Sequence, residues 1–346
     1  MITMKGCCGL VLVVFASAAH ADPVRLMSYS DAAFQDTYTN AVIKPFNQKG
    51  GAQIQFVGGN TSASMLGQLR TQKSDPQLDV VIMDTTTAAI ACAEGLVEPV
   101  TETLVPVLGE LDPQARKAGG ECGPGVTFDH LVFAYDSKLV TPAPASLDVL
   151  SDKSWSGKIG LSAPPNILGL ALTAILAHAD TGDWKNADGA FKKLRELAPS
   201  VQTFDPQPDS YTQVLNGTLA FGIGWNARAQ LNHDRSNGRL DVMLPSEGTV
   251  FQINTINVVK GSHNREAAFA FMNYALGTEA QQAFTEKSFY APTNQHAVIS
   301  AAVAARTAIS PENITRVIPL DWSEMIKLRD AWNQRWRREV ISAGNR

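Results

Sequence analysis

The chain lacks the residue patterns that mark many enzyme active sites. It has no H-E-x-x-H pair of metal-binding histidines, no G-x-S-x-G nucleophile turn and no G-x-x-x-x-G-K-[ST] phosphate loop. Its six histidines are scattered, and none has the spacing of a metal site. We therefore expect no catalytic residue, no metal ligand and no cofactor.

The chain has no large excess of positive or negative charge, and long apolar runs are rare. The chain has 29 Lys and Arg against 33 Asp and Glu, which gives a net charge of −4. This mild acidity argues against a nucleic-acid partner and against a basic membrane-binding patch. After residue 21, no apolar stretch is long enough to span a bilayer.

The first 21 residues have the features of a secretory signal peptide. Lys5 precedes an apolar run at 9–16, and Ala19-His20-Ala21 is an A-x-A cleavage signature. The run is too short to cross a membrane, so cleavage after Ala21 is favoured over an uncleaved anchor. We expect export to the periplasm.

The chain has only four cysteines, and two of them lie in the predicted signal peptide. Cleavage would leave Cys92 and Cys122, because Cys7 and Cys8 precede the cleavage site. An oxidising compartment favours a Cys92–Cys122 disulfide, and two buried free thiols are the alternative. No C-x-x-C pair is present, which argues against zinc and thioredoxin-type chemistry.

Strand and helix patterns alternate along the mature chain, which predicts an α/β protein of two lobes. Apolar β-rich runs and amphipathic segments alternate up to residue 94, and the run at 126–135 is expected to cross into a second lobe. Strands at 241–244 and 251–259 lead back. The predicted lobes are 22–128 with 258–346, and 129–257. Two crossings predict a hinge and a cleft that closes on a ligand.

Polar residues gather where the predicted strands end, which is the usual ligand position in open α/β sheets. Each one also has a structural explanation: Asp84 could cap a helix, and Trp225 could belong to the core. Their shared position at strand ends makes them candidates for ligand binding. The set is Tyr29, Ser30, Asn60, Thr61, Asp84, Thr85, Asn166, Trp225, Asn226 and Arg228.

Five further segments of the chain are informative: 28–35 (SYSDAAFQ), 79–96 (ending AEGL), 221–228 (FGIGWNAR), 289–294 (FYAPTN) and 318–322 (IPLDW). Together they resemble the polyamine-type family of substrate-binding proteins of ABC importers. The resemblance implies the type II periplasmic binding protein fold, with two lobes that each hold a mixed, mostly parallel sheet flanked by helices. It also implies a non-enzymatic, monomeric receptor that delivers a small molecule to an ABC permease in the inner membrane.

The same resemblance indicates which ligand to expect. Asn254 stands where polyamine receptors carry a key Asp, and Gln252 stands at a neighbouring aromatic position. Arg228 matches an Arg of the γ-aminobutyrate-binding branch, and a guanidinium fits a carboxylate bidentately. The resemblance adds Asn254 and Tyr290 to the candidate ligand contacts, with Asp84 as a partner for an amine.

A carboxylate or zwitterion, such as an amino-acid-like compound, is therefore favoured over a polyamine, which is the alternative ligand. A secreted α/β enzyme and a periplasmic sensor are the alternative classes of protein.

Overall fold

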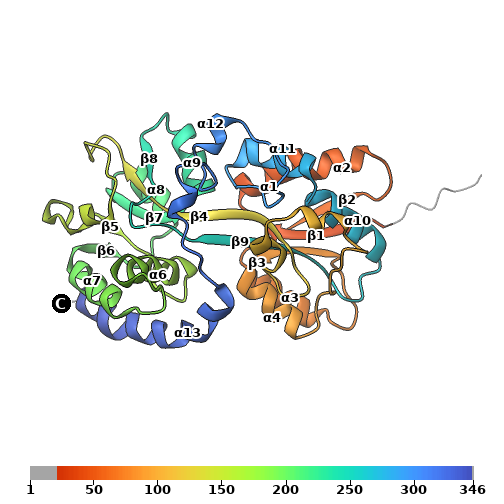
Figure 1. Cartoon of the computed structure of the whole chain (residues 1–346), viewed down its shortest axis with the longest axis horizontal. Helices are drawn as coiled ribbons and strands as arrows, with labels where there is room; N and C mark the ends of the chain where they lie inside the picture. Colours follow the sequence, from red (N-terminus) through yellow and green to blue (C-terminus); the bar gives the residue numbers. More distant parts are fainter. Residues whose placement is uncertain (1–21, 345–346) are drawn as a thin grey trace, which may run out of the picture.

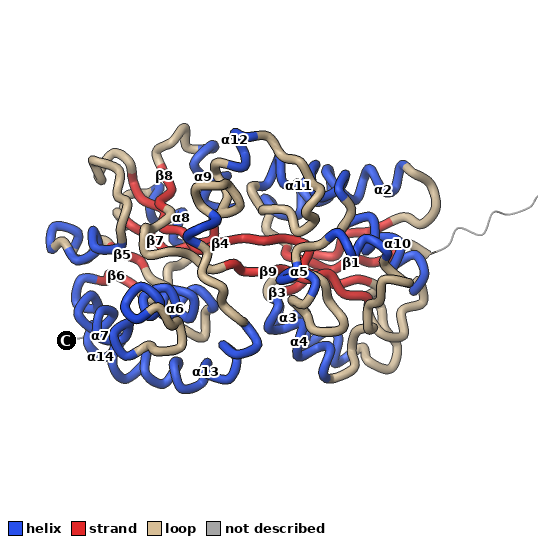
Figure 2. The backbone as a smooth tube through the Cα atoms, in the orientation of Figure 1, coloured by secondary structure: helices blue, strands red, loops and turns tan. Residues whose placement is uncertain are grey.

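The computed structural model describes residues 22–344, so the predicted signal peptide lies outside the described residues. Two α/β halves lie side by side along the long axis of the molecule, and both contribute to a continuous run of strands (Figure 1). Figure 2 shows helices on both sides of these strands. No helix in this part of the chain is long and apolar enough to cross a membrane.

Parallel strands form the centre of the first half. β1 (Val24–Tyr29) lies between β2 (Ile54–Gly59) and β3 (Val80–Asp84), and β9 (Phe251–Val258) pairs antiparallel with β3. Residues 80–83 are fully buried because helices cover both faces of a parallel sheet. The helices of this half are α1 (Ala32–Tyr38), α2 (Lys44–Gln48), α3 (Ser62–Thr71), α4 (Thr85–Ala93), α5 (Pro113–Arg116), α10 (Arg265–Ala275) and α11 (Thr278–Ser288), with a π-helical turn (Thr39–Ile43) between α1 and α2.

The second half is built around the long strand β4 (Gly125–Asp136). β7 (Phe221–Trp225) and β8 (Leu240–Met243) pair antiparallel with it, and β5 (Ile159–Gly160) and β6 (Val201–Thr203) extend the sheet beyond β7. The helices of this half are α6 (Ile167–Thr181), α7 (Asp188–Leu197), α8 (Ser210–Leu215) and α9 (Asn226–Arg235).

Strands β4 and β9 run between the two halves as an antiparallel pair. The first part of β4, 125–130, pairs with β9, whereas 131–136 pairs with β7 and β8. All 12 residues of β4 are buried. The crossing that the sequence predicts at 126–135 is therefore made by this strand. Strand pairing through β4 is continuous from the first half into the second.

The C-terminal segment differs from the predicted lobe boundaries. Helix α13 (Trp322–Arg335) and the π-helical turn that follows it pack into the core of the second half, although 258–346 was assigned to lobe 1. Trp336 is fully buried, and its Nε1 donates a hydrogen bond to Thr173 on α6 at 2.9 Å. Burial of this tryptophan, together with Trp332 and Val340, is the physical reason for the difference.

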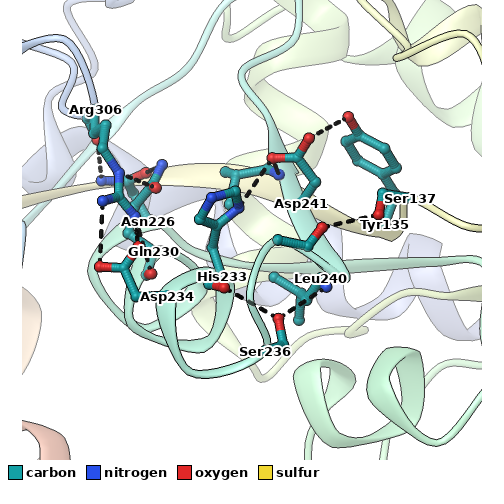
Figure 3. Close-up of polar contacts among 12 residues, drawn as sticks. Tyr135, Ser137, Asn226, Gln230, His233, Asp234, Ser236, Leu240, Asp241 and Arg306 are labelled. Atoms are coloured by element: carbon teal, nitrogen blue, oxygen red, sulfur yellow. Dashed lines mark hydrogen bonds and ion pairs between the residues drawn. The ribbon is translucent and has the colours of Figure 1, made fainter.

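A second connection joins the halves beside α9. Arg306, which follows α12 (Ala301–Ala304), donates hydrogen bonds from Nε to Gln230 and from a terminal nitrogen to Asp234, both at 2.8 Å (Figure 3). Figure 1 shows α9 and α12 at the top of the view and α13 at the bottom, with β4 and β9 between them.

The predicted disulfide is confirmed, because Cys92 at the end of α4 is bonded to Cys122 just before β4. The bridge closes a loop with a sequence separation of 30 residues. It fixes the segment between α4 and the crossing strand to the first half.

We predict that reduction of this disulfide lowers the free energy of unfolding by about 3.5 kcal/mol, because the reduced unfolded chain regains the entropy of a loop of this length. Urea denaturation with and without a phosphine reductant measures the change. The Cys92→Ser/Cys122→Ser variant should have the free energy of unfolding of the reduced protein, and the reductant should not change it. Equal stability of the oxidised and reduced proteins would contradict the prediction.

Candidate ligand-binding site

A cavity of about 700 Å³ lies between the two halves. It is lined by the N-terminal ends of α3, α4 and α6, by the crossing strands, by the start of α9 and by one face of α13. Strand ends and helix starts therefore meet at this cavity, as the sequence predicts for the ligand site.

Most of the predicted ligand contacts line this cavity. Residues from both halves are brought together, although they are far apart in the sequence. Those in the lining are Tyr29, Asn60, Thr61, Asp84, Asn166, Trp225, Arg228, Asn254 and Tyr290.

Three predicted contacts lie outside the cavity lining. Ser30 is exposed, and Thr85 is buried in the first turn of α4. The amide of Asn226 is buried; its nitrogen donates to the backbone oxygen of Arg306 at 2.9 Å, and its oxygen accepts from Gln230. The side chain of Asn226 is therefore used to hold α9 against the segment after α12.

Helix capping explains several of the polar side chains at the cavity. Asp84 caps α4: its Oδ1 accepts from the Thr87 backbone N–H at 2.9 Å, and its Oδ2 accepts from the Thr87 hydroxyl at 2.8 Å. Asn166 caps α6, and Thr61 caps α3. Both oxygens of Asp84 are thus engaged within the protein, which leaves it poorly placed to receive a ligand amine.

A hydrogen-bonded network fixes the wall of the cavity at the crossing strands. The Tyr29 hydroxyl lies 2.8 Å from the Ser62 hydroxyl and donates to Asn254 Oδ1 at 3.2 Å. The Asn254 amide nitrogen donates to Thr127 on β4, and Gln252 donates to the same Oδ1. Burial raises the pKa of Tyr29 well above its usual value, so the phenol stays protonated and can act as the donor.

Arg228 reaches the cavity from α9 and meets an aspartate of the other half. A terminal nitrogen of its guanidinium lies 3.3 Å from Asp31 Oδ2, and Asp31 caps α1. Among the described residues, Asp31 is the one ion-pair partner of Arg228, and the Arg228 side chain donates no hydrogen bond. Asp31 therefore supplies a compensating negative charge to this guanidinium from the other half.

The lining residues that sequence reasoning missed include Asp31, Asp129 and one face of α13. Asp31 directly follows the polar loop after the first strand, so its position was a usable signal. Asp129 interrupts an otherwise apolar run, and an acid inside a buried strand is also a signal. The lining residues of α13 are Trp322, Met325, Ile326, Arg329, Asp330 and Asn333.

Acidic side chains outnumber basic ones in the cavity lining. The acids are Asp31, Asp84, Asp129 and Asp330, against the bases Arg228 and Arg329. Among the described residues, no group of three or more His, Cys, Asp or Glu side chains is arranged to hold a metal ion. The arrangement provides charged and polar groups of both signs on rigid elements, with an apolar wall from Trp225 and α13.

Comparison with known proteins places these features in a family. The sequence profile of the bacterial extracellular solute-binding protein family matches residues 41–311. The spermidine/putrescine-binding periplasmic protein of Escherichia coli is 22% identical over 96% of this chain and 92% of its own. The γ-aminobutyric acid-binding protein of Pseudomonas aeruginosa is 25% identical over 89% of this chain and 85% of its own.

Solved structures show the same fold. The crystal structure of an ABC transporter substrate-binding protein from Bradyrhizobium japonicum has a TM-score of 0.77 and 20% identity, and the match covers 90% of this chain and 99% of that one. The resemblance to the polyamine-type receptors, the type II periplasmic binding protein fold and the absence of an enzymatic role are thereby confirmed. The chain belongs to the bacterial extracellular solute-binding protein family.

Proposed function

We propose that the cavity binds a small zwitterionic organic solute, such as an amino-acid-like compound, with its carboxylate on Arg228. The two halves close over the solute, and the closed form delivers it to an ABC permease in the inner membrane. Cleavage after Ala21 places the mature chain in the periplasm.

The observation that carries this proposal is the state of the Arg228 guanidinium. It lines the cavity, and its side chain is 46% exposed. Its one ion pair within residues 22–344, to Asp31, is a single contact of 3.3 Å and not a bidentate pair. Guanidinium donors therefore face the cavity, where a ligand carboxylate can accept two parallel hydrogen bonds.

The charge of the lining favours a ligand that also carries a cation. Acids outnumber bases around the cavity, so a simple dicarboxylate would meet net repulsion. A polyamine remains the second candidate, since polyamine binding is named for several relatives. Against it, Arg228 stands in the cavity, and Asn254 replaces the acid that polyamine receptors use. A zwitterion satisfies charges of both signs.

A thermal-shift screen separates these ligand classes, because a compound that binds only the folded protein raises its Tm. We use three sets of probes: amino acids, including γ-aminobutyrate and L-arginine; polyamines, including putrescine and spermidine; and dicarboxylates, including succinate and glutarate. We predict that the largest shift comes from the amino acids. A largest shift from the dicarboxylates, or from neutral sugars added as a fourth set, would overturn the proposed ligand class.

We predict that Arg228→Ala weakens binding of the most stabilising amino acid roughly a hundredfold, because a charge-assisted contact worth about 2–4 kcal/mol is lost. Isothermal titration calorimetry measures this change. Arg228→Lys keeps the charge but not the planar fork, so its loss should be smaller, on the order of tenfold. The unliganded Tm of both variants should stay within a few degrees of wild type, because the Asp31 pair is solvent-accessible. Wild-type affinity of Arg228→Ala would show that no carboxylate binds there.

Closure of the halves is tested by small-angle X-ray scattering. We predict a smaller radius of gyration with the saturating amino acid than without it, because the crossing strands form a hinge on one side of the cavity. The Arg228→Ala variant, mixed with the same concentration of amino acid, is the control and should keep the larger radius. An unchanged wild-type radius at saturation would argue against a cleft that closes.

A further inference from the structure

Three aspartates are buried in the described part of the chain: Asp79, Asp129 and Asp136. A buried carboxylate is stable only when partners replace the water that it has lost. Asp79 has such partners, because the side chains of Ser262 and Asn264 donate hydrogen bonds to it. It lies outside the cavity, so its partners come entirely from the protein.

The other two buried aspartates lie on the same strand, β4, and their surroundings differ. Asp136 lies outside the cavity and pairs with Arg239 at 3.3 Å. Asp129 lines the cavity and is 2% exposed, but it makes no ion pair with any described residue. The backbone N–H groups of His130 and Ala227 donate to its Oδ1, at 2.8 and 3.1 Å. Both of these hydrogen bonds go to one oxygen, and the backbone N–H of Asn226 also lowers the pKa of the carboxyl. No side chain of a described residue donates to Asp129, which leaves Oδ2 for a partner from the cavity.

Arg228, which lines the same cavity, does not form an ion pair with this carboxylate. Arg228 influences Asp129 electrostatically, but its ion pair is with Asp31 of the first half. Asp84, the amine partner expected from the sequence, already uses both oxygens to cap α4. Within the described part of the chain, Asp129 is therefore the buried cavity carboxylate that pairs with no cation, and the start of α9 holds it in place.

We propose that Asp129 binds the cationic group of the ligand, an ammonium or a guanidinium, through Oδ2. This inference rests on the proposed zwitterionic ligand of the same cavity and names the residue that receives its cation. Arg228 on α9 and Asp129 on the crossing strand then receive the two charged groups of one solute. Because β4 passes between the halves, the contact also ties the ligand to the hinge.

The pH dependence of ligand binding distinguishes a ligand-binding Asp129 from an Asp129 with a purely structural role. Burial raises the pKa of its carboxyl to about 7, against the smaller opposing effects of its N–H donors and Arg228. The other titratable neighbours do not change charge near neutral pH: burial raises the pKa of Tyr211 and of Tyr290, and lowers that of the adjacent His130 to about 3. A ligand cation stabilises the ionised form, so binding below pH 7 must release a proton from Asp129.

The test compares Asp129→Asn with Asp136→Asn, which removes the same charge from the same strand away from the cavity. We expect Asp129→Asn to weaken binding of the most stabilising amino acid at least tenfold at pH 8. Wild-type affinity should fall between pH 7 and pH 5, and this fall should vanish in Asp129→Asn. Asp136→Asn should keep both the affinity and its pH dependence, although it unfolds more easily because Arg239 loses its partner.

The thermal stability of the unliganded protein gives a second test of the role of Asp129. The folded state raises the carboxyl pKa above its unfolded value, so stability is lost as pH rises through about 7. Unliganded Asp129→Asn should therefore melt at a higher temperature than wild type, and the gain should be larger at pH 8 than at pH 5. A lower Tm at pH 8 would show that the carboxylate has a partner within the protein and would overturn the inference.

The outcomes separate this inference from the proposed function. If amino acids stabilise Asp129→Asn as well as they stabilise wild type, Asp129 does not bind the cation, while the zwitterionic ligand stands. If polyamines stabilise wild type most and Asp129→Asn abolishes the shift, the role of Asp129 stands and the zwitterion is wrong. If no amine-bearing probe stabilises wild type, both proposals fail.

Discussion

The antiparallel pairing of β4 with β9 is the constraint on which the rest of the molecule depends. It places Thr127 opposite Asn254 and Asp129 opposite Gln252, and β3 on the other side of β9 places Asp84 opposite Asn254. These polar groups therefore occupy one region of a single hydrogen-bonded sheet. A shift of one residue in this register would turn the alternate side chains to the other face and remove the polar wall of the cavity.

The cavity combines this fixed wall with elements that belong to different halves. Helix starts from both halves point at it, and their exposed N–H groups are satisfied by Asp84, Asn166 and Thr61. Arg228 and Asp31 approach from opposite halves and form a single solvent-accessible ion pair. Such a pair contributes little to stability. Under the proposed function, a ligand carboxylate would replace this pair as the halves close, at small cost to the fold.

Much of the fold is predictable from the sequence because its strands and helices have clear periods. The crossing run at 126–135 and the returning strand at 251–259 match β4 and β9 closely. The C-terminal helix α13 was not expected, because it carries many charges and its buried tryptophans contact segments that are distant in sequence. Trp322 donates from Nε1 to the backbone oxygen of Phe251, and Trp332 packs against Phe191. The lobe boundary was misplaced for the same reason.

The candidate site was predictable in part, and the limit has a physical cause. Strand ends point to Tyr29, Asn60, Trp225 and Arg228, because local sequence alone determines where a strand stops. The partner of Arg228 could not be found in this way, since Asp31 meets it only after both halves are assembled. The different roles of Asp84 and Asp129 depend on which oxygens are already hydrogen-bonded, and only the folded structure shows this.

A crystal structure of the protein with the most stabilising amino acid bound is the most direct test of the account. It should show the ligand carboxylate within hydrogen-bond distance of the Arg228 guanidinium and the cationic group beside Asp129 Oδ2. The ligand should lie between the crossing strands and α13, with contacts to both halves. A ligand bound in the reverse orientation, or bound outside this cavity, would contradict the account.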